Sequence, residues 1–280
     1  MAHLRNEASN LTESFEASAH TYERRLGSAT RAVARHVVSL LSTTLPAQPV
    51  VLDNACGTGA LTEEVLQAVP AAHVHAVDRS AGMTSIVRAS IDAKGWRDNV
   101  ETAVMDGQSL AFNNGSFDFS VTLFGIFFFS DPVHGAAEIY RTLKVGSTAV
   151  VTAWKVVGII PIFYAVQDKI KPAAPVRSMP VFEKWMLKET VESVMRQGGF
   201  ANVKVTEKQV TLTGKSKTEL VEGLADNMKG IVGNEWSDEE KSKLPGATER
   251  LLEERGGEFC VESQGEKGVR MVAWIALCRK

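Results

Sequence analysis

A turn that contains two glycines is the first feature of this sequence that could do chemistry. It runs Asp53-Asn54-Ala55-Cys56-Gly57-Thr58-Gly59 directly after an apolar stretch, and Asp78 ends the next apolar stretch along the chain. Glycines let a backbone approach a bound ligand closely. A carboxylate at the end of the next parallel strand can accept hydrogen bonds from both hydroxyls of a ribose. Together the turn and Asp78 indicate a nucleoside-bearing cofactor.

A dinucleotide is the competing ligand. The dinucleotide-binding fingerprint needs a further glycine after Gly59, but Thr62 stands at that position, and a threonine would loosen the helix packing that serves a pyrophosphate. Tyr140 and Lys144 have the spacing of a hydride-transfer pair. Tyr140 also falls on the apolar stripe of a predicted helix, so we expect it to pack in the core.

The elements that must position these residues follow from the apolar pattern. Short apolar strands alternate with amphipathic helices between residues 50 and 155, which predicts a doubly wound α/β fold around a parallel sheet. Strands are predicted at 50–54, 73–78, 100–105, 117–123, 147–154, 201–213 and 268–278. Helices are predicted at 26–41, 61–69, 80–93, from 132, at 187–197 and within 215–256, with N-caps at Ser80, Asp131 and Ser237.

The chain is expected to form one domain over residues 1–280. Within it we expect an N-terminal helical cap at 1–45, a cofactor-binding core at 46–155, cap or insertion segments at 156–200 and 214–260, and terminal strands at 201–213 and 268–278.

Three later segments narrow the choice of cofactor. Met105-Asp106-Gly107 ends the third predicted strand, where a carboxylate could accept the exocyclic amine of an adenine; a solvated turn aspartate is the alternative. Phe117-Asp118-Phe119 begins the fourth strand, and residues 141–147 link a helix to the fifth. The order of these segments favours S-adenosylmethionine over a dinucleotide.

With these motifs in this order, the sequence resembles the class I S-adenosylmethionine-dependent methyltransferases over about residues 12–213 and again at 268–278. The resemblance implies a Rossmann-like, mostly parallel sheet of seven strands whose last strand inserts antiparallel beside 201–213. Residues 51–57, 15–27 and Trp154 look similar to fungal secondary-metabolite methyltransferases. That likeness implies methyl transfer to an O, N or S atom of a small, largely apolar molecule. A protein or peptide methyltransferase and a non-catalytic, cofactor-binding regulatory relative remain alternatives.

Two positions depart from the family pattern. Ala55 stands where the first glycine of motif I is usual, and Ser147 replaces the second glycine of the later segment. Alanine is tolerable at the first of these positions if its φ is negative.

The resemblance also implies which residues hold the ligands. Those expected to bind S-adenosylmethionine, and its product S-adenosylhomocysteine, are Tyr22, Asp53, Asn54, Ala55, Cys56, Gly57, Asp78, Arg79, Met83, Met105, Asp106, Gly107 and Phe124. Those expected to line an apolar substrate pocket are Phe127, Phe128, Trp154, Phe163, Tyr164, Met179 and Trp185, although for Phe127 to Phe129 ordinary core packing is an equal alternative.

No catalytic base can be assigned from the sequence. His20, His134 and Tyr164 are candidates, but a lone histidine or tyrosine is more often structural. Cys56, inside the turn, is expected to be a packed residue. His73 and His75 point to one face of a short strand, but no third ligand is near them in sequence, so we expect no metal.

Composition excludes several other functions. The 31 Lys and Arg residues nearly balance the 33 Asp and Glu residues, so a nucleic-acid partner is not expected. No apolar run is long enough to span a bilayer, and no secretory signal is visible. The three cysteines lack the spacing of a disulfide or zinc framework. We therefore expect a cytoplasmic enzyme that acts on a small molecule without a membrane partner.

Overall fold

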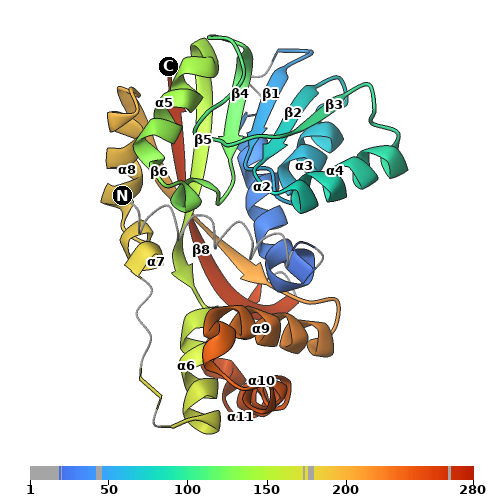
Figure 1. The fold of residues 1–280 in the computed structure, drawn as a ribbon, viewed down its shortest axis with the longest axis vertical. Helices are drawn as coiled ribbons and strands as arrows, with labels where there is room; N and C mark the ends of the chain where they lie inside the picture. The colour runs from blue at the N-terminus through green and yellow to red at the C-terminus, as the bar shows by residue number, and fades with distance from the viewer. Residues whose placement is uncertain (1–18, 20, 42–45, 173, 176–179, 264–265) are drawn as a thin grey trace.

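A computed structural model describes residues 19, 21–41, 46–172, 174–175, 180–263 and 266–280. Its centre is a sheet with strand order β3-β2-β1-β4-β5-β8-β6, and β7 pairs with β8 off this path (Figure 1). The strands are β1 (Val50–Asn54), β2 (His73–Asp78), β3 (Val100–Val104), β4 (Phe117–Thr122), β5 (Leu143–Val157), β6 (Asn202–Leu212), β7 (Cys260–Ser263) and β8 (Glu266–Arg279).

The first five strands are parallel, and β8 lies antiparallel between β5 and β6. This arrangement confirms the predicted doubly wound sheet with its antiparallel last strand. Among the described residues the sheet has eight strands rather than the expected seven, because the short β7 forms a hairpin with the start of β8.

Helices flank this sheet (Figure 1). They are η1 (Glu23–Gly27, a π-helix), α2 (Ser28–Leu41), α3 (Ala60–Ala68), α4 (Ala81–Lys94), η2 (Ile126–Phe128), α5 (Pro132–Thr142), α6 (Ile159–Ile170), α7 (Pro180–Trp185), α8 (Lys188–Gln197), α9 (Lys217–Val232), η3 (Gly233–Glu235), α10 (Asp238–Ser242) and α11 (Leu244–Phe259). No helix among the described residues is long and apolar enough to cross a membrane.

The predicted helix starts have a visible chemical cause. The side chains of Ser80 and Asp131 accept hydrogen bonds from the backbone N–H groups of Met83 and His134 and so cap α4 and α5. Ser237 forms the expected capping box with Glu240 at the start of α10.

Strand β5 begins earlier and ends later than the predicted 147–154. Leu143 pairs with Phe117 of β4 across a bulge, while Val156 and Val157 pair with β8 beyond the end of β4. The apolar pattern indicated only the buried centre of this strand, because its two ends pair with different neighbours.

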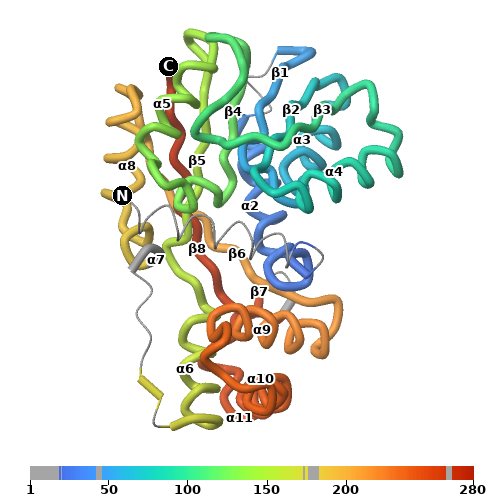
Figure 2. The backbone as a smooth tube through the Cα atoms, in the orientation of Figure 1, coloured from blue at the N-terminus to red at the C-terminus, as the bar shows by residue number. Residues whose placement is uncertain are grey.

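The lower part of the molecule is a group of helices built on the far ends of the long strands. Helices α6, α9 and α11 pack against one another, with α10 beside α11, below β5, β6 and β8 (Figure 2). Helix α9 also contacts η1, so the N-terminal segment bridges the lower helices and the sheet.

Candidate functional site

A cavity lies at the carboxyl ends of β1, β2, β3 and β4, the edge at which open α/β sheets hold their ligands. It encloses about 940 Å³, open solvent included. Its walls are formed by Tyr22, Thr30, Ala55, Cys56, Gly57, Thr58, Ala60, Asp78, Arg79, Ser80, Met83, Met105, Asp106, Gly107, Gln108, Leu123, Phe124, Gly125, Phe128 and Phe129.

The glycine turn between β1 and α3 forms the floor of this cavity. Gly57 and Gly59 have φ of 53° and 86°, in the left-handed region that glycine adopts without strain. A Cβ on Gly57 would meet nothing within 4 Å, so the space beside its backbone is open. The turn therefore leaves room for a ligand against bare backbone.

Ala55 does not have the negative φ that would make it free of strain. Its φ is 57°, a conformation that costs an alanine roughly 1–2 kcal/mol relative to the right-handed region. The turn thus keeps the backbone path that a glycine would take, although a methyl group is present.

The methyl group of Ala55 is accommodated by Gly125, which follows β4. A Cβ on Gly125 would lie 2.5 Å from the Cβ of Ala55 and 3.1 Å from Cγ2 of Thr122. Gly125 has φ of −100°, which any residue adopts, so the requirement for glycine here is a matter of space. Positions 55 and 125 therefore share one small volume.

Asp78, at the end of β2, is held by the backbone on both sides of it. Its Oδ2 accepts a hydrogen bond from the N–H of Gly57 at 2.8 Å, and its Oδ1 accepts one from the N–H of Ser80 at 2.9 Å. These bonds join the glycine turn to the end of β2 and fix the carboxylate at the cavity wall. A fixed carboxylate at this edge suits the recognition of a diol.

Asp106 follows β3 and presents one free oxygen. Its Oδ1 accepts from the backbone N–H and from Nε2 of Gln108, at 2.9 and 3.1 Å. Gln108 is itself held, since its Oε1 accepts from the N–H of Asp131 at 2.6 Å. Within the part of the chain that the structure describes, Oδ2 of Asp106 has no hydrogen-bond partner. It is available to accept one from a ligand amine.

Phe124 forms an aromatic wall in a strained conformation. Its φ is 56°, unusual for a bulky residue, and its ring stacks on Trp154 with centroids 3.9 Å apart and an interplanar angle of 10°. Its N–H donates to Oγ1 of Thr152 at 2.9 Å. The stack and this bond hold the strained backbone in place, as is common at ligand sites.

Asp53 and Asn54 lie behind the turn rather than on the cavity wall. Both are fully buried. Oδ2 of Asp53 accepts from N and Oγ1 of Thr62, at 3.1 and 2.6 Å. Oδ1 of Asp53 and Oδ1 of Asn54 are buried and have no hydrogen-bond partner among the described residues. Burial, with a smaller contribution from the charge of Asp78, raises the pKa of Asp53 to about 7 despite the bonds from Thr62.

The N-terminal segment closes one side of the cavity. Tyr22 and Thr30 line it, and Oγ1 of Thr58 in the glycine turn donates to Oε1 of Glu23. Nε of Arg31 lies 3.2 Å from the same glutamate. A Cβ on Gly27 would lie 2.5 Å from Oε2 of Glu23, so this glycine makes room for the carboxylate in the π-helix. The glycine turn and η1 are thus tied together by side chains.

Several aromatic residues expected in a substrate pocket lie in the core instead. Phe127, Trp154, Phe163 and Trp185 are at most 6% exposed and belong to one hydrophobic cluster. Tyr164 is half-buried and packs against that cluster. None of these five lines the described cavity. Phe128 does, together with Phe129 and Leu123.

Met179, also expected in the substrate pocket, and His20, a candidate base, lie outside the described residues. Eleven of the thirteen expected cofactor residues line the cavity directly, and the other two, Asp53 and Asn54, are buried behind the turn.

The cavity also contains residues that the sequence did not indicate. Thr30 arrives from α2, Gln108 from the segment after β3, and Gly125 from the start of η2. Thr58 and Ser80 belong to motifs that were recognised, but no signal distinguished them from their neighbours. Helical residues such as Thr30 have no local pattern that shows which cavity they reach.

The candidate bases among the described residues either lie away from the cavity or have a pKa that does not suit proton abstraction. His134 is exposed on α5 and Tyr164 lies on α6, and neither lines the cavity. Tyr22 does line it, but burial raises the pKa of its phenol. Burial likewise raises the pKa of the Cys56 thiol, which makes it a weak nucleophile.

The alternative pair Tyr140 and Lys144 does not form a hydride-transfer site. Tyr140 contacts Phe200 with ring centroids 5.1 Å apart, and Lys144 bonds Oδ1 of Asp118 at 2.7 Å. Asp118 also accepts from the N–H of Val50, at the amino end of β1. Lys144 therefore lies at the amino ends of the strands, whereas the cavity lies at their carboxyl ends. This position removes the observation that favoured a dehydrogenase.

The comparisons with known proteins agree with this geometry. The methyltransferase domain family matches residues 51–146. Methyltransferase tpcH of Aspergillus fumigatus is 23% identical over 240 residues, which cover 80% of this chain and 83% of that protein. Acetylaranotin bis-thiomethyltransferase of Aspergillus terreus is 23% identical over 222 residues, covering 74% and 76%.

The fold also matches a solved structure. Phosphoethanolamine N-methyltransferase 2 of Haemonchus contortus, in complex with phosphomonomethylethanolamine and S-adenosylhomocysteine, has a TM-score of 0.53 and 16% identity. The match covers 88% of this chain and 52% of that one.

Proposed function

We propose that the chain is a class I S-adenosylmethionine-dependent methyltransferase that methylates an O, N or S atom of a small, largely apolar molecule. The observation that carries the proposal is the cavity, which is lined by two carboxylates at adjacent strand ends together with aromatic side chains. The relative from Aspergillus terreus, named for thiomethyl transfer in acetylaranotin, supports a secondary metabolite as the acceptor.

The residues of the cavity fit S-adenosylmethionine. Asp78 would accept the ribose hydroxyls, and the free Oδ2 of Asp106 would accept the adenine amine. The open backbone at Gly57 leaves space for the methionine part. The phenol of Tyr22 would donate a hydrogen bond there, because its raised pKa keeps it protonated.

Bound S-adenosylmethionine supplies a methyl group already activated by a sulfonium, so this chain has to align the acceptor and exclude water. The faces of Phe124, Phe128 and Phe129 offer an apolar wall for the acceptor and favour a positive charge near them. Since the described histidines do not line the cavity, an acceptor that is already nucleophilic, such as a thiolate or an amine, suits the site best.

Asp78→Asn tests the cofactor site. The change removes a negative charge and leaves one oxygen where two backbone N–H groups now bond. We expect the affinities for S-adenosylmethionine and S-adenosylhomocysteine to fall at least about tenfold in titration calorimetry, a loss of about 1.4 kcal/mol. Asp118→Asn is the matched control, because that carboxylate bonds one backbone N–H and Lys144 at the other edge of the sheet.

Unchanged affinity in Asp78→Asn would contradict the assigned site. If the wild-type protein binds both ligands, the acceptor class follows from a turnover assay with phenols, amines and thiols, read by mass spectrometry. Binding without methylation of any of them, but with methylation of peptides, would move the function to a peptide methyltransferase. Binding with no turnover at all would identify a regulatory relative.

A further inference from the structure

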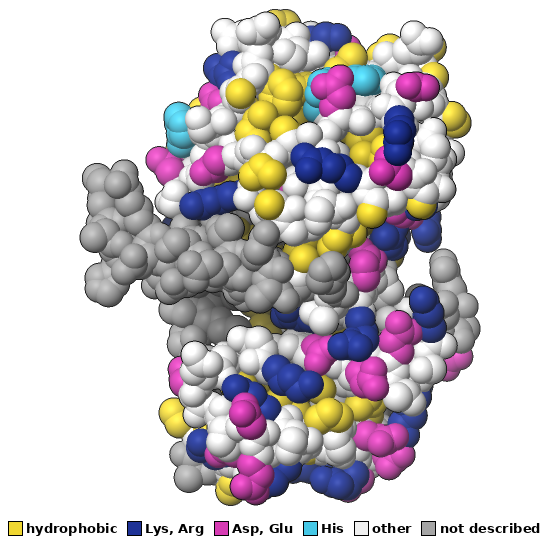
Figure 3. Space-filling view, turned by 45° about the vertical axis from the view of Figure 1, so that its right-hand side comes forward, with side chains coloured by type: hydrophobic (Ala, Val, Ile, Leu, Met, Phe, Trp, Pro, Cys, Tyr) yellow, Lys and Arg dark blue, Asp and Glu magenta, His cyan; other side chains and the backbone are white. Residues whose placement is uncertain are grey.

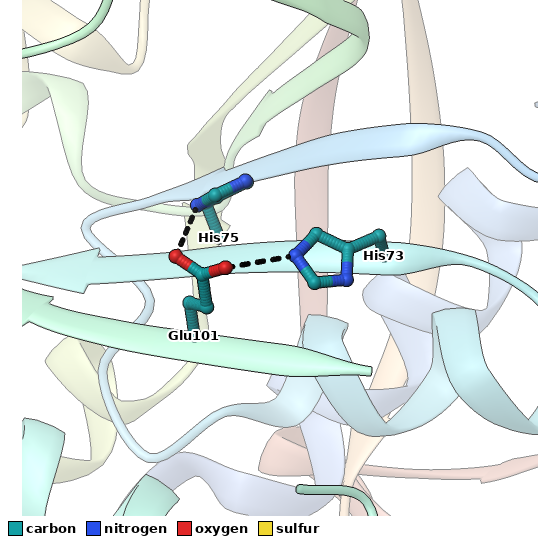
Figure 4. A group of neighbouring side chains, drawn as sticks. All are labelled: His73, His75 and Glu101. Carbon is teal, nitrogen blue, oxygen red and sulfur yellow. Dashed lines mark hydrogen bonds and ion pairs between the residues drawn. The ribbon is translucent and has the colours of Figure 1, made fainter. Parts of the chain in front are cut away.

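A group of three potential metal ligands lies on the sheet far from the cavity. His73 and His75 of β2 and Glu101 of β3 point toward one another (Figure 4), and one ligand atom from each lies within 4.8 Å of the others. The register explains their meeting: His73 and His75 share a face because strand side chains alternate, and Glu101 is the β3 partner of His75. Sequence separation hid this third ligand.

We propose that His73, His75 and Glu101 form a binding site for a divalent transition-metal ion, with Zn²⁺ as the occupant. Two imidazole nitrogens and one carboxylate oxygen suit zinc and its neighbours better than Mg²⁺ or Ca²⁺, which prefer oxygen ligands alone. Three protein ligands leave a further position open for water or for an outside ligand.

The distances are close to those that a bound ion requires. Oε1 of Glu101 lies 3.1 Å from Nε2 of His73, and Oε2 lies 3.5 Å from Nδ1 of His75. Ligands at about 2.0–2.1 Å from a tetrahedral Zn²⁺ are about 3.3 Å apart. The two distances between histidine nitrogens and the carboxylate oxygens therefore match the spacing of ligands on one ion, and one donor atom of each residue lies within 4.8 Å of the others.

The surroundings support one fixed ligand and two accessible ones. The ring of His75 makes edge contacts with Phe112 and Phe117, at centroid distances of 5.3 and 5.5 Å, which restrict its orientation. The side chains of His73 and Glu101 are 38% and 65% exposed, so an ion can enter from solvent. Figure 3 shows histidine side chains beside an acidic one on the surface of the upper part.

A metal ion at this site would link the edge strand β3 to its neighbour β2. Strand β3 ends the strand order and pairs only with β2 among the described strands, so an ion shared by β2 and β3 would hold the edge strand in place. His73 is at the amino end of β2 and Asp78 at its carboxyl end, about 16 Å away at the rise of a strand. Zinc and the methyl donor would therefore bind independently, and this proposal does not depend on the proposed function.

Titration calorimetry of the chelator-treated full chain with ZnCl₂ tests the proposal, with CoCl₂ as a spectroscopic probe of coordination. We expect one equivalent of tightly bound Zn²⁺ and the visible absorption of a Co²⁺ ion with nitrogen ligands. His73→Ala and Glu101→Gln should each weaken Zn²⁺ binding at least about tenfold. His134→Ala removes an exposed histidine on α5 and should change nothing.

A second measurement separates loss of the site from loss of the fold. A Zn²⁺ concentration that nearly saturates the wild type should raise its melting temperature by binding the folded state and raise that of Glu101→Gln clearly less, while both proteins keep their affinity for S-adenosylhomocysteine. Absence of Zn²⁺ binding to the wild type would overturn the proposal. So would equal binding by the wild type, His73→Ala and Glu101→Gln, because the ion would then sit elsewhere, for instance at the half-buried Cys260.

Discussion

At the scale of single residues, the site combines positions that are fixed by hydrogen bonds with positions that are strained. Asp78 and Asp106 are oriented by backbone N–H groups, whereas Ala55 and Phe124 have positive φ. Strain of this kind persists only where the surroundings enforce it. For Ala55 the surroundings include Gly125, which lacks a side chain and so leaves space for the methyl group of Ala55.

Gly125→Ala should destabilise the protein by roughly 1–3 kcal/mol, because the new methyl group would lie 2.5 Å from the Cβ of Ala55. In an Ala55→Gly background the same change should cost at least about 1 kcal/mol less, since only the contact with Thr122 remains. Urea unfolding of the four proteins gives this coupling as a double-mutant cycle. Additive effects at the two positions would show that they do not share a volume.

The buried Asp53 predicts a dependence of stability on pH. Burial raises its pKa from 3.8 to about 7 in the folded state, so the folded protein binds the proton more tightly than the unfolded chain does. The free energy of unfolding should therefore fall as the pH rises from about 4 to about 7 and stay constant above, by on the order of 4 kcal/mol in total.

Asp53→Asn should flatten this dependence, as measured by urea unfolding at a series of pH values. Asp118→Asn is an informative control: burial favours a higher pKa there, but Lys144 and the N–H of Val50 outweigh it and lower the pKa. Its contribution to stability is lost only in more acidic solution, as the pH falls through the lowered pKa. An unchanged pH profile in Asp53→Asn would mean that another group titrates in this window.

At the scale of elements, the π-helix η1 joins three parts of the molecule. Glu23 accepts from Thr58 of the glycine turn and pairs with Arg31 of α2, while Arg24 pairs with Asp226 of α9. The element that places Tyr22 on the cavity is thus held from both sides. Local π-helical turns are frequent at functional sites.

Thr58→Val should lower the affinity for S-adenosylmethionine several-fold, since it keeps the shape of the side chain and removes the hydrogen bond that ties η1 to the turn. Such a loss corresponds to about 1 kcal/mol, the usual net value of one hydrogen bond. Titration calorimetry measures it. Ser90→Ala is the control, because Ser90 bonds Glu63 in the neighbouring ionic network without touching the turn; an equal loss there would rule out a specific role for η1.

The elements around the site were predictable because their signals are local. Asp78 and Asp106 each follow a strand, and Ser80 and Asp131 cap helices within three residues of themselves. Glu101 was not recognised as a neighbour of His75 because the pairing of β2 with β3 is a tertiary contact. Phe163 was expected in the substrate pocket but lies in the core. The apolar pattern of a helix shows which face is buried, but it does not show whether that face packs in the core or lines a cavity. The positive φ of Ala55 could not be predicted from the sequence, because alanine usually avoids such values.

At the scale of the whole molecule, the antiparallel ladder of β5, β8 and β6 connects the sheet with the lower helices. Residues between Thr148 and Val157 of β5 pair with β8, and β8 pairs with β6 over the whole length of β6. Helix α6 follows β5 directly, and α11 leads into β7. Because shared strands connect the two parts, neither is expected to unfold alone.

Thermal or urea unfolding should therefore be one cooperative transition. Far-ultraviolet circular dichroism and tryptophan fluorescence should give the same midpoint, since Trp96 lies after α4 and Trp236 lies in the lower part. Two separate midpoints would show that the lower helices form an independent unit. Saturating S-adenosylhomocysteine should raise the single midpoint of the whole chain.

Strand β6 forms the other margin of the sheet, and it is eleven residues long. A long strand with unpaired backbone groups invites another polypeptide to add to it, which is a route to aggregation. Lys204, Glu207 and Lys208 interrupt the apolar residues of β6, so a second copy pairing in this place would have to desolvate several charges. Charged residues that take no part in the proposed chemistry are thus expected to protect this strand from pairing in a crowded solution.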